Sequence, residues 1–263
     1  ARRFEASGAE FRFPRLDISD FDSVMDAFSS YRPDAVLNCA AYNFVDKAET
    51  DYVGAYKANA FGPALLAHAA RKYGCVLVHY GTDYVFDGKK RTPYVETDAP
   101  DPLNQYGRSK LAGEELVLGS GARALVLRLS WVFGSGRQNF VSKLREWAAG
   151  GGPLRIADDE VSVPTYAGDV ADITLKAIDQ GLSGVYHLVN SGFCSRYDWA
   201  AAVLKELKLS NPLERASSAD FKPAAKRPPF SAMSNARLSG ALGTGIRDWR
   251  DALSAYLREE AVS

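Results

Sequence analysis

The chain has 263 residues, enough for one large α/β domain or for such a domain with a smaller lobe attached. Lys and Arg number 32, as do Asp and Glu, so the formal net charge is zero and neither nucleic acid nor an anionic membrane is expected as the main partner. The three cysteines form no C-x-x-C pair and no apolar run approaches the ~20 residues of a membrane span, which favours a cytoplasmic protein with reduced thiols.

The first twenty residues give two predictions. Residues 1–8 are typical of the end of a helix, with Gly8 as its stop signal. In the sequence LDISD, Asp17 could accept a hydrogen bond from an adenine amino group, while Ser19 or Asp20 is suited to cap a helix over residues 21–28. The two interpretations are compatible.

Short apolar runs alternate with helical stretches along the rest of the chain, which indicates βαβ units and a mostly parallel sheet. Strands are predicted at residues 35–41, 75–80, 124–133, 154–157 and 185–189. Helices are predicted at residues 59–73, 104–118, 137–149, 167–180, 196–207 and 247–258. Residues 211–234, rich in Pro, Ser and basic side chains, are predicted to form an ordered loop in a smaller C-terminal lobe.

Parallel sheets bind ligands at the carboxyl ends of their strands, which directs attention to residues 39–46, 81–88 and 130–140. The first of these follows the sequence Asn38-Cys-Ala-Ala-Tyr. Small side chains there would let a planar ligand lie against the backbone, and close packing of a helix on the sheet would explain them equally well.

Tyr106 and Lys110 are four residues apart in a predicted helix and therefore lie on one of its faces. A lysine ammonium in that position lowers the tyrosine pKa, and such a phenol can give a proton to a carbonyl oxygen as hydride reaches the carbon. The chain has 13 tyrosines, so a pair with this spacing could also be an ordinary surface pair.

Thr82 strengthens the catalytic interpretation. It directly follows the apolar run CVLVHYG, so its hydroxyl is expected at the carboxyl end of a strand, within reach of the same carbonyl oxygen. Turn chemistry alone would also account for Thr82 and Asp83. A strand, a threonine and then a Tyr-x-x-x-Lys helix are nevertheless a joint pattern that chance rarely supplies.

HYGTDYVFDG, NQYGRSKLAGE and LRLSWVFG, with Asn139-Phe140 close behind, resemble the extended short-chain dehydrogenase/reductase family. NCAAYNFVDKAE and LDISD add a similarity to its dTDP-4-dehydrorhamnose reductases, and the likeness runs from about Leu16 to Leu253. It implies a Rossmann-type, doubly wound parallel sheet with a small substrate lobe. Residues 1–135 would form the dinucleotide-binding domain, and residues 136–263 mainly the substrate-binding lobe, with some segments returning to the sheet.

The resemblance also implies roles for individual residues. Thr82, Tyr106 and Lys110 match the catalytic Thr, Tyr and Lys. Tyr106 and Lys110 would also bind the cofactor, NADPH or NADH, and Lys110 would do so at the nicotinamide ribose. Positions that line the cofactor are matched by Asp17, Ile18, Ala40, Ala41, Tyr42 and Asn43. Thr82, Asp83 and Trp131 match positions that face a deoxysugar, although Trp131 could instead be a core aromatic. Asn139 and Arg227 are similar to parts that hold the nucleotide diphosphate, and no metal ligand is assigned.

The family opens with a strand and a Gly-x-x-Gly-x-x-Gly turn that seats the cofactor pyrophosphate. Gly8 is the only glycine among the first fifty residues, so that turn is absent from this sequence. We expect that the sequence lacks the start of the protein; a loss of cofactor binding is the alternative. The residue that selects NADH or NADPH cannot be assigned.

The resemblance implies the reduction of a nucleotide-linked 4-keto-6-deoxy sugar in dTDP-L-rhamnose biosynthesis. The expected partner is a nucleotide-sugar substrate, and a homodimer is one expected assembly. Two alternatives remain. An epimerase or 4,6-dehydratase of the same fold is one, although Asp83 is followed by Tyr84 and not by the second acid a dehydratase needs. A non-catalytic regulatory subunit is the other.

Overall fold

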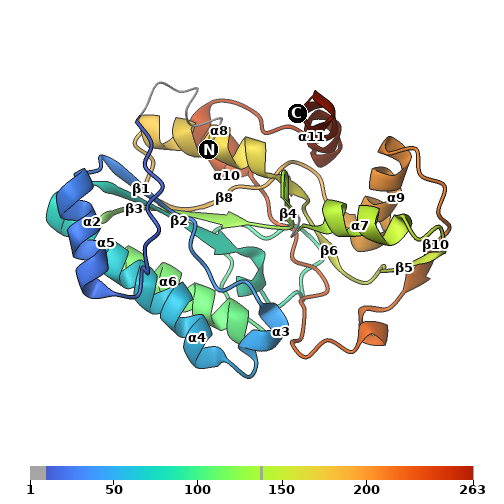
Figure 1. The fold of residues 1–263 in the computed structure, drawn as a ribbon, viewed down its shortest axis with the longest axis horizontal. Coiled ribbons are helices and arrows are strands. Elements are labelled where there is room, and N and C mark those ends of the chain that lie inside the picture. Colours follow the sequence, from blue (N-terminus) through green and yellow to red (C-terminus); the bar gives the residue numbers. More distant parts are fainter. Residues whose placement is uncertain (1–9, 137–138, 263) are drawn as a thin grey trace.

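A four-stranded parallel sheet forms the centre of the structure (Figure 1). The computed structural model describes residues 10–136 and 139–262, so the helix end predicted at residues 1–8 lies outside the described residues. Neighbouring strands follow the order β1-β2-β3-β8. Their bounds are β1 (Ala35–Asn38), β2 (Val76–Thr82), β3 (Arg123–Leu129) and β8 (Gly184–His187).

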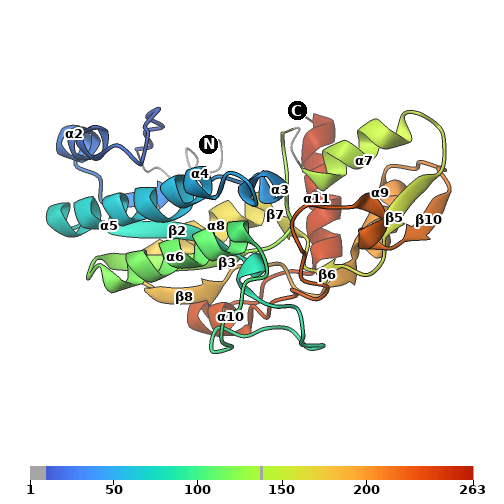
Figure 2. The same cartoon turned by 90° about the horizontal axis from the view of Figure 1, so that it is seen from below.

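Helices cover both faces of this sheet (Figures 1 and 2). Successive residues of a strand face opposite sides of the sheet. Leu77 and Val126 therefore belong to one apolar cluster, and Val78 and Leu125 to the other. One layer contains α2 (Phe21–Tyr31), α5 (Gly62–Tyr73) and α6 (Gln105–Gly119); the other contains α8 (Ala167–Asp179) and α10 (Ala236–Leu242). The predicted α/β class with a parallel, doubly covered sheet is therefore confirmed.

The ends of these helices follow from their capping residues. Of the two candidate caps before α2, Asp20 is the one used, because its Oδ1 accepts a hydrogen bond from the Ser23 N–H at 2.7 Å. Gly74 ends α5 in the left-handed conformation, with φ at 74°. The helix predicted over residues 59–73 begins differently, with a π-helical turn, η1 (Lys57–Phe61), ahead of α5.

A second apolar core lies in the C-terminal part of the chain, around Phe133, Trp199, Trp249 and Tyr256. Its elements are α7 (Phe140–Ala148), β5 (Leu154–Ala157), α9 (Arg196–Glu206), β10 (Leu213–Ala216) and α11 (Trp249–Val262). The prediction of a loop at residues 211–234 is wrong in part, because β10 pairs in parallel with β5 and the 3₁₀ turn η3 (Ser218–Phe221) follows. β10 is a strand because it pairs with β5, which lies far away in the sequence. No local sequence pattern reveals such a pairing.

The strand predicted at residues 124–133 is interrupted. β3 ends at Leu129, and Trp131 has a φ of 38°, which turns the chain out of the sheet. The remaining short elements are α3 (Val45–Ala48), α4 (Tyr52–Tyr56), η2 (Asp83–Val85), β4 (Val132–Phe133), β6 (Val161–Ser162), β7 (Thr165–Tyr166) and β9 (Cys194–Ser195). Within residues 10–136 and 139–262, every helix is too short or too polar to cross a membrane.

Candidate active site

Thr82 is the last residue of β2, at the carboxyl edge of the sheet. Its backbone is extended, and the chain then turns into η2. The Thr82 hydroxyl accepts a hydrogen bond from the Tyr84 N–H at 3.2 Å and donates one to Asp83 Oδ1 at 3.3 Å. These contacts hold the hydroxyl at the end of the strand, as the sequence predicts.

Tyr106 lies in the first turn of α6, beside Thr82. Asn104 caps this helix, accepting from the Gly107 N–H at 2.8 Å, and its amide also donates to the Lys226 carbonyl at 2.8 Å. The Tyr106 ring meets the Tyr84 ring edge to face, with 5.8 Å between centroids. Burial raises the pKa of Tyr106 to about 12, and a hydrogen bond with the Thr82 hydroxyl opposes that rise. The phenol therefore carries its proton at neutral pH.

Lys110 follows one turn later on α6 and is 3% exposed. Its Nζ donates to the Tyr80 carbonyl on β2 at 2.6 Å. Burial lowers the pKa of Lys110 to about 8, and the nearby Glu114 carboxylate opposes that fall. The sequence predicts that Lys110 lowers the Tyr106 pKa, but the net pKa of Tyr106 is raised, because burial and the charges of Asp83 and Glu114 disfavour the phenolate. The Lys110 ammonium is bound to a backbone carbonyl.

The loop after β1 contains four of the residues predicted to line the cofactor: Ala40, Ala41, Tyr42 and Asn43. Asn59, in the π-helical turn, fixes this loop by accepting from the Tyr42 N–H at 2.8 Å and donating to the Tyr42 carbonyl at 3.1 Å. The same amide donates to Ser109 Oγ on α6 at 2.9 Å. The loop is thereby tied to the helix that carries Tyr106 and Lys110.

Asp17 and Ile18, the other two residues predicted to line the cofactor, precede α2. Asp17 is exposed, and its Oδ1 accepts hydrogen bonds from the N–H and hydroxyl of Ser19, which lower the pKa of this carboxyl. Ile18 packs against the start of α5, where a Cβ on Gly62 would come within 2.6 Å of its side chain. Asp17 is thus an ionised, accessible hydrogen-bond acceptor.

Asp83 is 3% exposed, and serine hydroxyls from distant segments surround its carboxylate. Its Oδ2 accepts from Ser231 Oγ at 2.5 Å, Ser162 Oγ at 3.0 Å and Ser130 Oγ at 3.3 Å. Burial raises the Asp83 pKa, while the bonds from Ser231 and Ser162 oppose that rise. Asp83 therefore connects the end of β2 to three segments later in the chain.

Trp131 and Asn139, two of the predicted substrate residues, line one cavity of about 340 Å³. The Arg196 guanidinium lies 3.7 Å above the Trp131 ring, and the Trp199 ring stacks on Trp131 with centroids 5.5 Å apart. Lys143 adds a second positive charge to the lining. The Asn139 side chain caps α7, accepting from the Ser142 N–H at 3.1 Å. Aromatic and cationic groups thus share this cavity.

Arg227, the remaining predicted substrate residue, is not among the residues that line this cavity. It forms a two-pronged ion pair with Asp46 of α3, at 2.5 and 2.6 Å, which lowers the pKa of Asp46 to about 2. Its charge also acts on the Tyr84 phenol, as that of Arg196 does. Arg227 is therefore engaged with a carboxylate.

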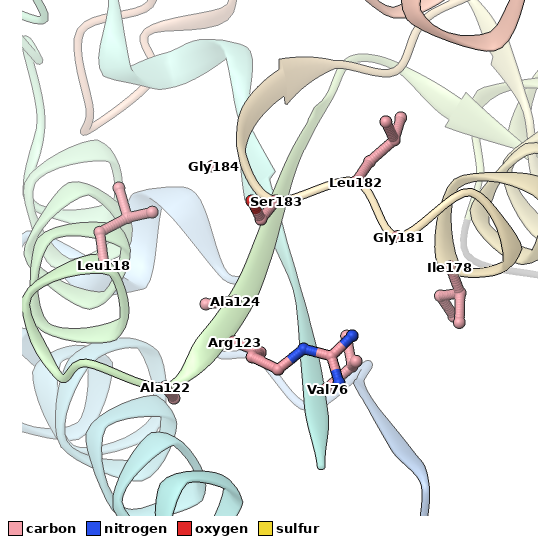
Figure 3. A pocket seen from close by; sticks show the side chains of 10 residues that line it. All are labelled: Val76, Leu118, Ala122, Arg123, Ala124, Ile178, Gly181, Leu182, Ser183 and Gly184. Carbon is pink, nitrogen blue, oxygen red and sulfur yellow. The ribbon is translucent and has the colours of Figure 1, made fainter. Parts of the chain in front are cut away.

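Another cavity, of about 420 Å³, lies at the opposite end of the sheet (Figure 3). It is lined by the first residues of β2 and β3, the turn before β8, and side chains from α6 and α8, including Leu118 and Ile178. The predicted site residues do not line it, so its position at the amino ends of the strands separates it from Thr82.

Several residues that build the site were not singled out from the sequence. Asn59 and the serines around Asp83 act across long sequence separations, and no local pattern distinguishes them. Glu114 carried a usable signal, since it lies one helical turn after Lys110 and a buried helix face is an unusual place for a carboxylate.

Comparison with known proteins gives consistent results. The sequence profile of the RmlD substrate binding domain matches residues 2–262. The spore coat polysaccharide biosynthesis protein SpsK of Bacillus subtilis is 37% identical over 94% of this chain and 86% of its own length. A dTDP-4-dehydrorhamnose reductase of Mycobacterium tuberculosis is 42% identical over 88% and 78%. The crystal structure of dTDP-4-dehydrorhamnose reductase from Bacillus anthracis in complex with NADP superposes with a TM-score of 0.91, at 31% identity, over 95% and 89%.

Proposed function

This chain belongs to the RmlD substrate binding domain family, and from that premise we propose that it is an NAD(P)H-dependent reductase of a nucleotide-linked 4-keto-6-deoxy sugar. The relatives named dTDP-4-dehydrorhamnose reductase support dTDP-4-dehydrorhamnose as the substrate and dTDP-L-rhamnose biosynthesis as the setting. The fold is of the Rossmann type that these relatives share.

One observation carries the proposal: the Thr82 hydroxyl and the Tyr106 phenol lie beside each other at the carboxyl edge of the sheet, one helical turn from Lys110. A phenol that keeps its proton at neutral pH is ready to act as a general acid. The threonine hydroxyl can donate to the same ketone oxygen as negative charge develops there.

Each of the three residues has its own role in the reaction. Thr82 orients the ketone oxygen, and Tyr106 transfers its phenolic proton to that oxygen. Lys110, positively charged below about pH 8, favours the phenolate that this transfer leaves behind. A bound nicotinamide supplies the hydride that reaches the carbonyl carbon. One hydride and one proton together convert the ketone into an alcohol.

The chain's groups fit a nicotinamide dinucleotide. The loop of Ala40 and Ala41 has small, accessible side chains at the carboxyl end of β1, and Asn59 holds it in place. Asp17 offers an ionised acceptor for an amino or hydroxyl group, and Lys110 offers a donor for a ribose hydroxyl. An NADP complex of a family relative supports the same cofactor class here.

We assign the substrate's sugar to Thr82, Asp83 and Trp131, and its diphosphate to the side of Asn139 and Arg227. The cavity that Trp131 lines supports this assignment, because Arg196 and Lys143 bring positive charge to an aromatic wall. In such a cavity the aromatic surface suits a ring of the substrate and the cations suit its phosphates.

Replacing Tyr106 with Phe tests the proposal. Without the phenolic hydroxyl, turnover of the keto sugar should fall by roughly 10²–10⁴-fold, the usual contribution of a general acid. Turnover is followed as oxidation of reduced cofactor, which a 4,6-dehydratase would not consume overall. Tyr31→Phe, a matched change on the exposed side of α2, should leave the rate unchanged.

Two results would contradict the proposal. Unchanged turnover in Tyr106→Phe would remove the phenol from the reaction. A wild-type protein that turns over no keto sugar but binds a stoichiometric enzyme partner would instead identify a regulatory subunit.

A further inference from the structure

Glu114 is a buried acid that the catalytic scheme above does not use. We propose that Glu114, paired with Arg128, is a positioning residue that holds the Thr82 backbone and the Lys110 ammonium in their reactive places. This inference rests on the proposed reduction and adds a residue to it. Three independent features of the structure support it.

The first feature is the geometry of the pair. Glu114 lies on α6, one turn after Lys110, and its side chain is 1% exposed. Its Oε2 accepts from Arg128 Nε at 2.9 Å and from the second guanidinium nitrogen at 2.8 Å. Arg128 lies on β3 directly opposite Gly81 of β2 in the strand register. The pair therefore joins α6 to the two central strands at the level of the residue before Thr82.

The second feature is a close approach at Gly81. A Cβ at this position would lie 2.2 Å from Glu114 Oε1, so a side chain there would displace the carboxylate. Glu114 thus lies directly against the backbone that leads into Thr82. Burial raises the pKa of Glu114, while the Arg128 guanidinium and, to a lesser extent, the Thr82 N–H favour its ionised form.

The third feature is that the pair is poorly suited to a purely stabilising role. Burying two charges is costly, and a well-packed apolar pair is often as stable. Among the described residues, Glu114 Oε1 and Arg128 Nη1 are buried without a hydrogen bond of regular geometry. A buried pair that leaves polar atoms unsatisfied calls for another explanation than stability.

Charge links the pair to Lys110. Glu114 is the carboxylate that raises the Lys110 pKa against the effect of burial. The charge of Lys110 also acts on His79 of β2, and burial keeps that imidazole neutral. Removing the negative charge of Glu114 therefore favours the neutral form of Lys110.

Glu114→Gln in the full chain tests the proposal, since it keeps the shape and removes the charge. The kcat should fall by roughly 10- to 100-fold through lost positioning, while KM for the keto sugar changes less than about threefold. The alkaline limb of the kcat–pH profile should move to lower pH. Glu115→Gln, the exposed neighbour on the same helix, should change neither quantity.

A second variant covers the case in which a lone buried Arg128 prevents folding. Glu114→Gln combined with Arg128→Gln removes both charges, and it should fold and still show the lower kcat and the shifted alkaline limb. If either folded variant keeps the wild-type kcat and pH profile, the positioning role is overturned and the reductase assignment stands. If the wild-type protein reduces no keto sugar, both are overturned.

Discussion

The Lys110 ammonium is a pH-sensitive group of the candidate site. Burial disfavours its charged form, so its pKa falls to about 8, well below the ordinary lysine value. Tyr106 titrates far higher, near 12, and stays protonated throughout the neutral range. A change in activity between these two values would therefore report on the lysine.

Activity should accordingly decline as pH rises through about 8. Below that value Lys110 is charged and favours the Tyr106 phenolate that proton transfer produces; above it this assistance is lost. The check is kcat for keto-sugar reduction over the range from neutral to alkaline pH. Lys110→Met should be slower and should lack this limb, and a wild-type profile that stays flat above pH 8 would contradict the assignment.

The three candidate catalytic residues could be predicted because two short motifs contain them. A threonine directly after an apolar run and a Tyr-x-x-x-Lys helix are local patterns, and the structure brings Thr82 and Tyr106 into contact. The pKa of Tyr106 could not be predicted, because it depends on burial and on the charge of Asp83, which is far from Tyr106 in the sequence. Likewise, the serines that surround Asp83 come from segments that meet only in the folded chain.

At the scale of elements, the contact between α6 and η1 decides how the two halves of the site are joined. Gly113 of α6 faces the Asn59 carbonyl, and a Cβ there would lie 2.0 Å from that oxygen. Asn59 in turn holds the loop of Tyr42. A single absent side chain therefore allows the helix of Tyr106 to approach the turn that fixes the loop predicted to line the cofactor.

Gly113→Ala should lower the free energy of unfolding by roughly 1–3 kcal/mol, because the new methyl group meets backbone that cannot move away freely. Gly119→Ala is the matched control at the end of the same helix, where a Cβ would meet nothing within 4 Å. It should be neutral or stabilising by up to ~1 kcal/mol. Urea unfolding of both variants gives the comparison, and equal stabilities would show that α6 can shift without loss.

The bounds of an element could be predicted where capping residues set them. They could not be predicted where pairing with a distant strand sets them. Asp20 and Gly74 mark helix ends in the sequence and in the structure. The π-helical turn carries no such mark, since its residues continue the helical pattern of α5. β10 exists because it pairs with β5, and the break after β3 depends on the left-handed backbone of Trp131.

At the scale of the whole molecule, Asp83 lies where the sheet meets the later segments of the chain. Its carboxylate binds hydroxyls that follow β3, lie in β6, and lie in the loop after β10. These contacts hold the wall that contains Trp131 against the end of β2, since Ser130 is the neighbour of Trp131. The division into a dinucleotide-binding domain and a substrate-binding lobe stays a prediction, and Asp83 is one of the residues that would join the two parts.

This position has a consequence for stability. Burial raises the folded-state pKa of Asp83 above its unfolded value near 3.9, so the folded protein holds the Asp83 proton more tightly than the unfolded chain does. The stabilising contribution is full below the unfolded pKa and is lost as pH rises through the folded pKa. Asp83→Asn, which stays neutral, should therefore gain stability relative to the wild type as pH rises above about 4.

Asp87 provides the opposite case in the same loop. Hydrogen bonds from Lys89 and Tyr94 lower its pKa to about 2, so its contribution is present at neutral pH and is lost on acidification. Asp87→Asn should accordingly lose stability relative to the wild type as pH rises from about 2 to about 4, which lies below the interval in which Asp83→Asn gains it. Urea unfolding of the wild type and the two variants at matched pH values tests both predicted directions. If the free energies of unfolding of the two variants change with pH in the same way, burial does not raise the pKa of Asp83.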